Sequence, residues 1–185
     1  MARIELRPDT WAMVDYDADR IRAIAAEMAA AAGLPADLEV VVALDDRSPL
    51  GRYSIDGMDP VLISMESGAF EDPKHPRQLS ECGAAGVIGR LLFRVADRRT
   101  EGFADVPEDA DVEPAAGVAW EVYAAGRLAR TGQQAQRQRW RYHFRNRHGF
   151  SDEADAAFDR LWSADDLTWA DVQALSAAAL AATPA

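Results

Sequence analysis

A reversal of charge in the second half of the chain limits how that half can fold. Between Glu121 and Asp152 the sequence has seven arginines and no acidic residue, whereas the whole chain of 185 residues carries a formal net charge of −11. Guanidinium groups are costly to bury without a hydrogen-bonded counter-charge. The basic segment must therefore lie against carboxylates of its own chain or bind an anionic partner.

The sequence predicts that this basic segment forms a helix over about 134–148, ended by Gly149. Its candidate binding residues are Arg137, Arg141, Arg145, Arg147 and His148. The first three are spaced by four residues, so they line one row of the helix, where like charges repel one another. An acidic group is therefore expected opposite the row, and we interpret it as a contact with an acidic protein or with a second copy of the chain.

Two alternatives to this interpretation follow from the neighbouring sequence. Acidic segments at 99–113 and 151–171 flank the helix, and their carboxylates can neutralise the row without any partner. A nucleic-acid strand stacked on the aromatic side chains is the other alternative. The net charge of the whole chain argues against that one, because it repels a polyanion.

Composition narrows the class of protein further. One cysteine, Cys82, excludes an internal disulfide and suits a reducing compartment. The N-terminus lacks an apolar leader, and no stretch approaches the roughly 20 apolar residues of a membrane helix. Lys74 is the only lysine among 20 basic residues, which with heavy alanine use is typical of a GC-rich bacterial genome. We therefore expect a cytoplasmic bacterial protein without a membrane contact.

No catalytic motif or metal site stands out. His143 and His148 are five residues apart, whereas a helical zinc pair is four residues apart on one face. No cysteine lies near them to complete a ligand set. We therefore expect neither catalytic residues nor a metal or other cofactor, and interpret the protein as non-enzymatic.

The first half of the chain predicts a small sheet between two helices. Asp17 is a suitable N-cap, and Gly33 ends the helix that follows it. The predicted elements are a helix over 18–32, strands over 38–44, 52–56 and 61–66, a loop over 67–77, and a long helix over 78–98. The last two strands are expected to be an antiparallel pair.

The second half predicts helices only. Pro114 opens one helix, Ser151 caps another, and Thr168 with Asp171 forms a capping box for a third. The fold class is therefore α+β, with a three-stranded sheet packed with helices and a helical C-terminal half. We expect one domain over 1–185, in which a helical extension over 114–185 packs on an α/β core over 1–98.

The order of elements over 18–98 resembles the minimal zincin-like proteins of bacteria, in which a helix and a small sheet precede a helix with the motif His-Glu-x-x-His. Arg90 and Arg94 stand where that family has its two histidines, and Leu91 replaces the glutamate. Arginine does not bind zinc and leucine cannot act as a general base, so the resemblance implies the fold without its zinc and its activity.

Arg90 and Arg94 form a second candidate site, because they are four residues apart on one helix. An enzyme of zincin-like ancestry without zinc could hold the carboxylate or phosphate of a small anionic molecule there. The alternative is a solvated or ion-paired helix face.

Overall fold

The computed structural model describes residues 2–182, which fall into two compact units that join between Ala96 and Asp97. The first unit contains a sheet with helices, and the regular elements of the second are helices. The chain is therefore α+β with a helical C-terminal half, as the sequence predicts. The packing of residues 114–185 on the α/β core as one domain stays a prediction.

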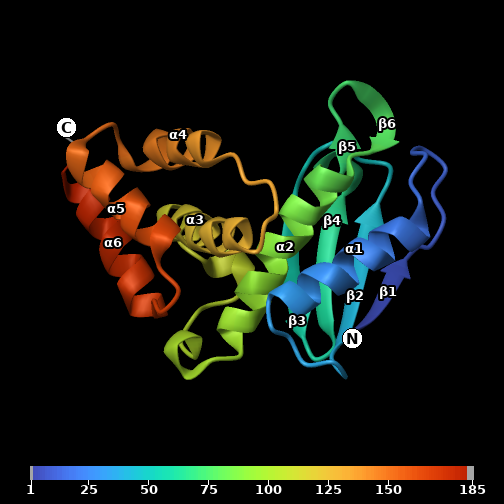
Figure 1. Cartoon of the computed structure of the whole chain (residues 1–185), viewed down its shortest axis with the longest axis horizontal. Coiled ribbons are helices and arrows are strands. Elements are labelled where there is room, and N and C mark those ends of the chain that lie inside the picture. Colours follow the sequence, from blue (N-terminus) through green and yellow to red (C-terminus); the bar gives the residue numbers. More distant parts are fainter. Residues whose placement is uncertain (1, 183–185) are drawn as a thin grey trace. The chain divides into compact units, whose positions relative to one another are not determined.

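A mixed sheet of four strands organises the first unit (Figure 1). Its strands lie in the order β1-β2-β4-β3; β1, β2 and β4 are parallel, and β3 is an antiparallel edge strand. The elements of this unit are β1 (Arg3–Arg7), α1 (Ala18–Ala31), β2 (Glu39–Asp45), β3 (Tyr53–Met58), β4 (Val61–Glu66), the 3₁₀ turn η1 (Ser67–Ala69), β5 (Glu71–Asp72), β6 (His75–Leu79) and α2 (Glu81–Arg98).

Both helices of this unit cover the same face of the sheet (Figure 1). Alternation along the strands creates that face, because Val42 of β2 lies in register with Ile63 of β4 and both are fully buried. Helical spacing completes the core with Ile21 and Met28 of α1. The antiparallel pairing of β3 with β4 and the Asp17 cap of α1 confirm the sequence-based predictions.

Three predictions for the first unit are wrong. The sheet has a fourth strand, β1, in which only Ile4 and Leu6 alternate with charged residues, so no apolar run marks it. The predicted loop over 67–77 contains the short hairpin of β5 and β6. Helix α2 begins at Glu81 instead of 78, because the Ser80 hydroxyl accepts the Gly83 N–H at 3.1 Å and so caps the first turn.

The second unit is a helical bundle built around its first long helix. Its elements are the 3₁₀ turns η2 (Glu101–Phe103) and η3 (Asp109–Asp111), then α3 (Pro114–Arg130), α4 (Arg137–His148), α5 (Asp152–Ser163) and α6 (Trp169–Ala181). Helix α3 contacts the other three helices and is buried on nearly all sides, so the single apolar stripe predicted for it is too narrow. The predicted Ser151 cap and the Thr168–Asp171 capping box are both present.

Candidate functional site

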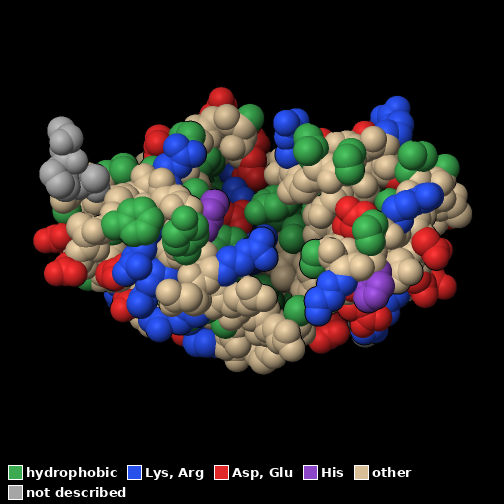
Figure 2. Space-filling view, turned by 90° about the horizontal axis from the view of Figure 1, so that it is seen from above, with side chains coloured by type: hydrophobic (Ala, Val, Ile, Leu, Met, Phe, Trp, Pro, Cys, Tyr) green, Lys and Arg blue, Asp and Glu red, His purple; other side chains and the backbone are tan. Residues whose placement is uncertain are grey.

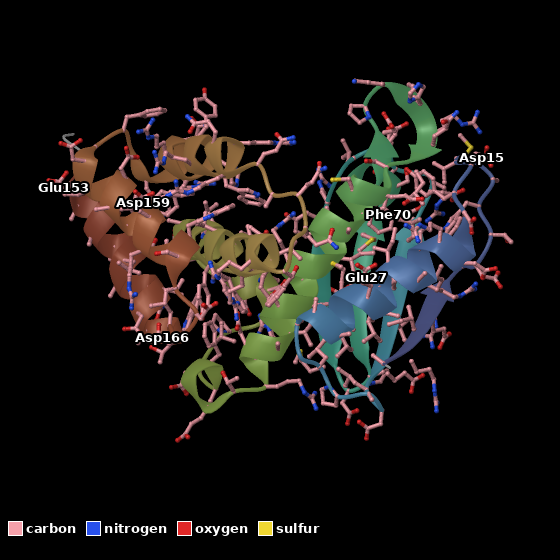
Figure 3. All side chains as sticks on the ribbon, viewed as in Figure 1. Asp15, Glu27, Phe70, Glu153, Asp159 and Asp166 are labelled. Carbon is pink, nitrogen blue, oxygen red and sulfur yellow. The ribbon has the colours of Figure 1, made fainter. Side chains whose placement is uncertain are left out.

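The arginine row of α4 lies against α5. Arg137 and Arg141 each donate from Nη2 to the same oxygen of Asp159, at 2.8 and 2.5 Å. Arg145 holds Asp155 through two hydrogen bonds, one from Nε at 2.7 Å and one from Nη2. Asp155 and Asp159 are four residues apart on α5, and Figure 3 shows Asp159 on this helix among nitrogen-bearing side chains. Two rows of opposite charge therefore lie side by side.

This pairing supplies the counter-charge that the sequence demands. The Arg145 guanidinium holds the pKa of the Asp155 carboxyl below its usual range, and Arg141 also lies over the Phe158 ring, 5.2 Å from its centroid. The internal-pairing alternative thus describes Arg137, Arg141 and Arg145. The hypothesis that these three arginines are a partner-binding row loses its motive, because each of them already binds a carboxylate of α5.

Substituting Gln for all three paired arginines is expected to lower the melting temperature of the protein by a few degrees, because Asp155 and Asp159 lose their partners. Circular dichroism during heating measures this change. The same substitutions should leave the affinity for an acidic peptide unchanged. Arg99→Gln, which alters an exposed arginine with no ion pair among residues 2–182, is the control. An unchanged melting temperature would show that these ion pairs do not stabilise the unit.

The outward face of α4 differs from the paired row, because it combines exposed arginines with exposed aromatic rings. We call it the basic–aromatic face and define it as Arg139, Tyr142 and Arg147 of α4 together with Phe150, which follows the Gly149 cap of the helix. Tyr142 and Phe150 are 59% and 67% exposed and contact each other with ring centroids 6.1 Å apart. Arg139 and Arg147 are exposed, and neither forms an ion pair within residues 2–182. Figure 2 shows hydrophobic side chains beside basic ones on the surface of this unit.

His148, the last residue of α4, is buried and cannot serve as an exposed binding residue. Its ring stacks on Phe144 at 3.9 Å and is fully shielded from solvent. Nδ1 lies 3.2 Å from the Phe144 carbonyl oxygen, which can only accept, so Nδ1 carries the proton in the neutral ring. Nε2 then accepts from the Ser176 hydroxyl at 2.8 Å. The predicted site is therefore wrong at this residue.

Burial lowers the pKa of His148 from its ordinary value of 6.5, against the smaller opposing effect of its hydrogen bond to Phe144. The unfolded chain therefore binds a proton at His148 before the folded chain does as the pH falls. We expect the free energy of unfolding to be greatest above about pH 6.5 and to fall as the pH decreases below it. Urea unfolding at several pH values measures this slope. His148→Gln should reduce the dependence of the free energy of unfolding on pH. His143→Gln, on the exposed side of α4, should leave that dependence unchanged. The same pH dependence in both variants would contradict the prediction.

Arg90 and Arg94 both lie on a shielded side of α2. Arg90 donates from Nη1 to the Gly86 carbonyl at 2.6 Å and from Nη2 to the Tyr53 hydroxyl at 3.3 Å. Its guanidinium also lies over the Tyr53 ring. Arg94 is only 6% exposed. The burial of Arg94 contradicts the solvated form of the alternative at that residue, the ion-paired form stays open, and Arg90 contacts Tyr53 of the edge strand β3.

The described residues offer no ready metal centre. Within residues 2–182 no group of three or more His, Cys, Asp or Glu side chains is placed to hold a metal ion. Cys82 is exposed at the start of α2 and forms no disulfide within the described residues. In the same part of the chain, no helix is both long and apolar enough to cross a membrane.

Comparison of the chain with protein-family models, curated proteins and solved structures finds no match.

Sequence reasoning overlooked Arg139, Tyr142 and Phe150 as a surface. Arg139, His143 and Arg147 are also spaced by four residues and form a second row on the helix. Only the positions of Asp155 and Asp159 distinguish the two rows. Their i,i+4 spacing on the next helix indicates that one row is paired, but it does not say which of the two.

Proposed function

We propose that this protein is a non-enzymatic cytoplasmic protein that binds an acidic segment of another protein through the basic–aromatic face of α4. The observation that carries the proposal is an exposed face with two arginines that form no ion pair within residues 2–182 and two exposed aromatic rings, on a chain of net charge −11. Arginine and aromatic side chains are enriched in protein interfaces, where they supply both contact area and hydrogen bonds. A reducing compartment suits an exposed cysteine, Cys82, that is in no disulfide among residues 2–182.

Charge and ring geometry favour an acidic protein over a nucleic acid. The Tyr142 and Phe150 rings meet edge to face with planes 67° apart, so they do not form two parallel faces between which a base could insert. The overall negative charge also repels a polynucleotide, whose binding depends on neutralising many phosphates. An acidic peptide with apolar side chains can satisfy both arginines and cover both rings.

The proposal predicts that a double charge reversal, Arg139→Glu with Arg147→Glu, will weaken binding of a synthetic peptide of alternating glutamate and leucine. Exposed ionic contacts contribute at most about 1 kcal/mol each, so the loss should be about tenfold. Fluorescence anisotropy of the labelled peptide at low and high salt measures the affinity, which should fall with salt. Tyr142→Ser with Phe150→Ser should weaken binding with less change in the salt dependence.

The matched control is Arg99→Glu, which makes the same charge change outside α4. Absence of peptide binding at low salt, or an equal loss in the control, would overturn the proposal. Retention of a single-stranded oligonucleotide in preference to the peptide would favour the nucleic-acid alternative. A concentration-dependent mass in sedimentation that the double reversal abolishes would identify a second copy of the chain as the partner.

A second candidate is an enzyme of zincin-like ancestry without zinc. The element order agrees with that resemblance, because α2 follows β4 and presents Arg90 to Tyr53 on the antiparallel edge strand. Arg90 would hold a carboxylate or phosphate after releasing the Gly86 carbonyl. Calorimetric titration with succinate and phosphate, compared between the wild type and Arg90→Gln, tests this candidate. Stoichiometric zinc in the purified protein would contradict the loss of the metal site.

A further inference from the structure

A hollow of about 750 Å³ lies on the sheet of the first unit, at the carboxyl ends of the parallel strands β1, β2 and β4. Ligands of α/β proteins commonly bind at these strand ends. The lining residues come from the ends of those three strands, the turn after β2 and the start of β3. Neither Arg90 nor any residue of α4 lines the hollow, although Tyr53, which Arg90 contacts, does.

Strand register explains why the sheet is hollow at this place. Arg7, Ala43, Ser64 and Ser54 lie in register across β1, β2, β4 and β3 and form one transverse row. By alternation, this row lies on the face opposite the core residues Val42 and Ile63. Ala43, Ser64 and Ser54 have small side chains, so they form a low floor. A second row lies two residues further along and consists of Asp45, Glu66 and Arg52. Its longer, charged side chains border the floor of the hollow on one side.

Most charged groups around the hollow already have protein partners. Asp45 accepts from Arg47, and Arg7 donates to Glu5. Asp46 accepts the backbone N–H groups of Ala12 and Met13 at 2.7 and 2.9 Å, a long-range contact that holds the segment before α1 against the end of β2.

Four polar groups of the two rows remain available to a ligand. Within residues 2–182 the guanidinium of Arg52 forms no ion pair, and the hydroxyls of Ser54 and Ser64 form no hydrogen bond. Glu66 accepts only the backbone N–H of Arg52, at 3.3 Å, and its side chain does not pair with the Arg52 guanidinium. The serines are half-buried, so their hydroxyls are partly removed from water and favour a polar ligand that bonds to them.

We propose that this hollow binds a small polyhydroxylated molecule with a single anionic group. Arg52 takes the anionic group through its planar donors, as guanidinium does for both carboxylate and phosphate. Glu66 accepts hydrogen bonds from ligand hydroxyls, and Ser54 and Ser64 bond to the others. The formal charges of the lining balance, with Arg7, Arg47 and Arg52 against Asp45, Asp46 and Glu66, so a polyphosphate is not accommodated.

Backbone amide NMR spectra of labelled protein, titrated with gluconate, glucose 6-phosphate and glucose, test the proposal. We expect millimolar binding of gluconate or glucose 6-phosphate, with shifts at Arg52, Ser54, Ser64 and Glu66, and much weaker binding of glucose. The stronger of the two acids identifies the anionic group as carboxylate or phosphate. Absence of shifts at these residues, or equal binding of glucose, overturns the proposal.

Variants separate this site from a general surface effect. Arg52→Gln should weaken binding of the acids about tenfold or more, because a charge-assisted contact is lost. Arg3→Gln, at the opposite end of the same sheet face, should leave it unchanged. Ala43→Leu should block binding by raising the floor, and an intact amide spectrum shows that this variant remains folded. Equal affinities in Arg52→Gln and the wild type would overturn the role of the guanidinium. These outcomes do not depend on α4.

Discussion

Substituting alanine for Asp97 is expected to destabilise the second unit by about 3–5 kcal/mol. Asp97 is buried and binds both terminal nitrogens of Arg127 at 2.6 Å, and it also accepts from the Trp120 indole N–H at 2.7 Å. The Arg127 guanidinium in turn lies over the Tyr123 ring, 3.9 Å from its centroid. Removal of the carboxylate leaves a shielded cation and a buried indole donor without their acceptor.

Urea unfolding followed by tryptophan fluorescence measures this loss, since Trp120 reports on the site itself. Asp97→Asn should cost less, because the amide oxygen still accepts one hydrogen bond. The control is Asp105→Ala, an exposed aspartate in the same unit, which should change stability by no more than about 0.5 kcal/mol. If Asp97→Ala behaved like this control, the buried network would not contribute to stability as argued.

Substituting alanine for Gly126 is expected to destabilise the same unit by about 3 kcal/mol or more. Overpacking typically costs roughly 1–3 kcal/mol, and this substitution is expected to reach or exceed the upper end of that range. A Cβ at Gly126 would lie 2.1 Å from the Trp162 carbonyl oxygen and 2.8 Å from its carbonyl carbon. These are backbone atoms of α5, so no side-chain rotation relieves the clash. The same carbonyl accepts a hydrogen bond from Arg130 at 2.6 Å, which a displacement of α5 would also disturb.

Gly117→Ala, on the same helix, is the matched control for this variant. Its Cβ would meet only the Val112 side chain, at 3.4 Å, and alanine favours a helix over glycine by up to about 1 kcal/mol. We therefore expect Gly117→Ala to preserve or raise the melting temperature, whereas Gly126→Ala lowers it. Scanning calorimetry of the two variants compares them directly. A similar melting temperature in both would mean that α3 and α5 do not approach as closely as described.

Short-range signals in the sequence were sufficient to predict most of the helices and strands. Asp17, Ser151 and Thr168 each cap the helix predicted to follow them, because their oxygens bond to N–H groups only two or three residues away. Strand β1 escaped prediction because it has two apolar residues and gains its stability from pairing with β2, more than 30 residues later. The hollow could not be predicted for the same reason, because the residues of its floor come from three strands that are separated in the sequence.

The sequence by itself determined that seven arginines on a largely acidic chain require counter-charges, because a cation that loses water must regain its hydrogen bonds elsewhere. It also determined the helix that carries five of them and the spacing of the two possible rows. Only the tertiary structure decided which row faces Asp155 and Asp159 and which faces solvent, since helical periodicity defines the rows but not the direction in which they point. Rotation of α4 about its axis was decided by the burial of Phe144 and His148 in the bundle.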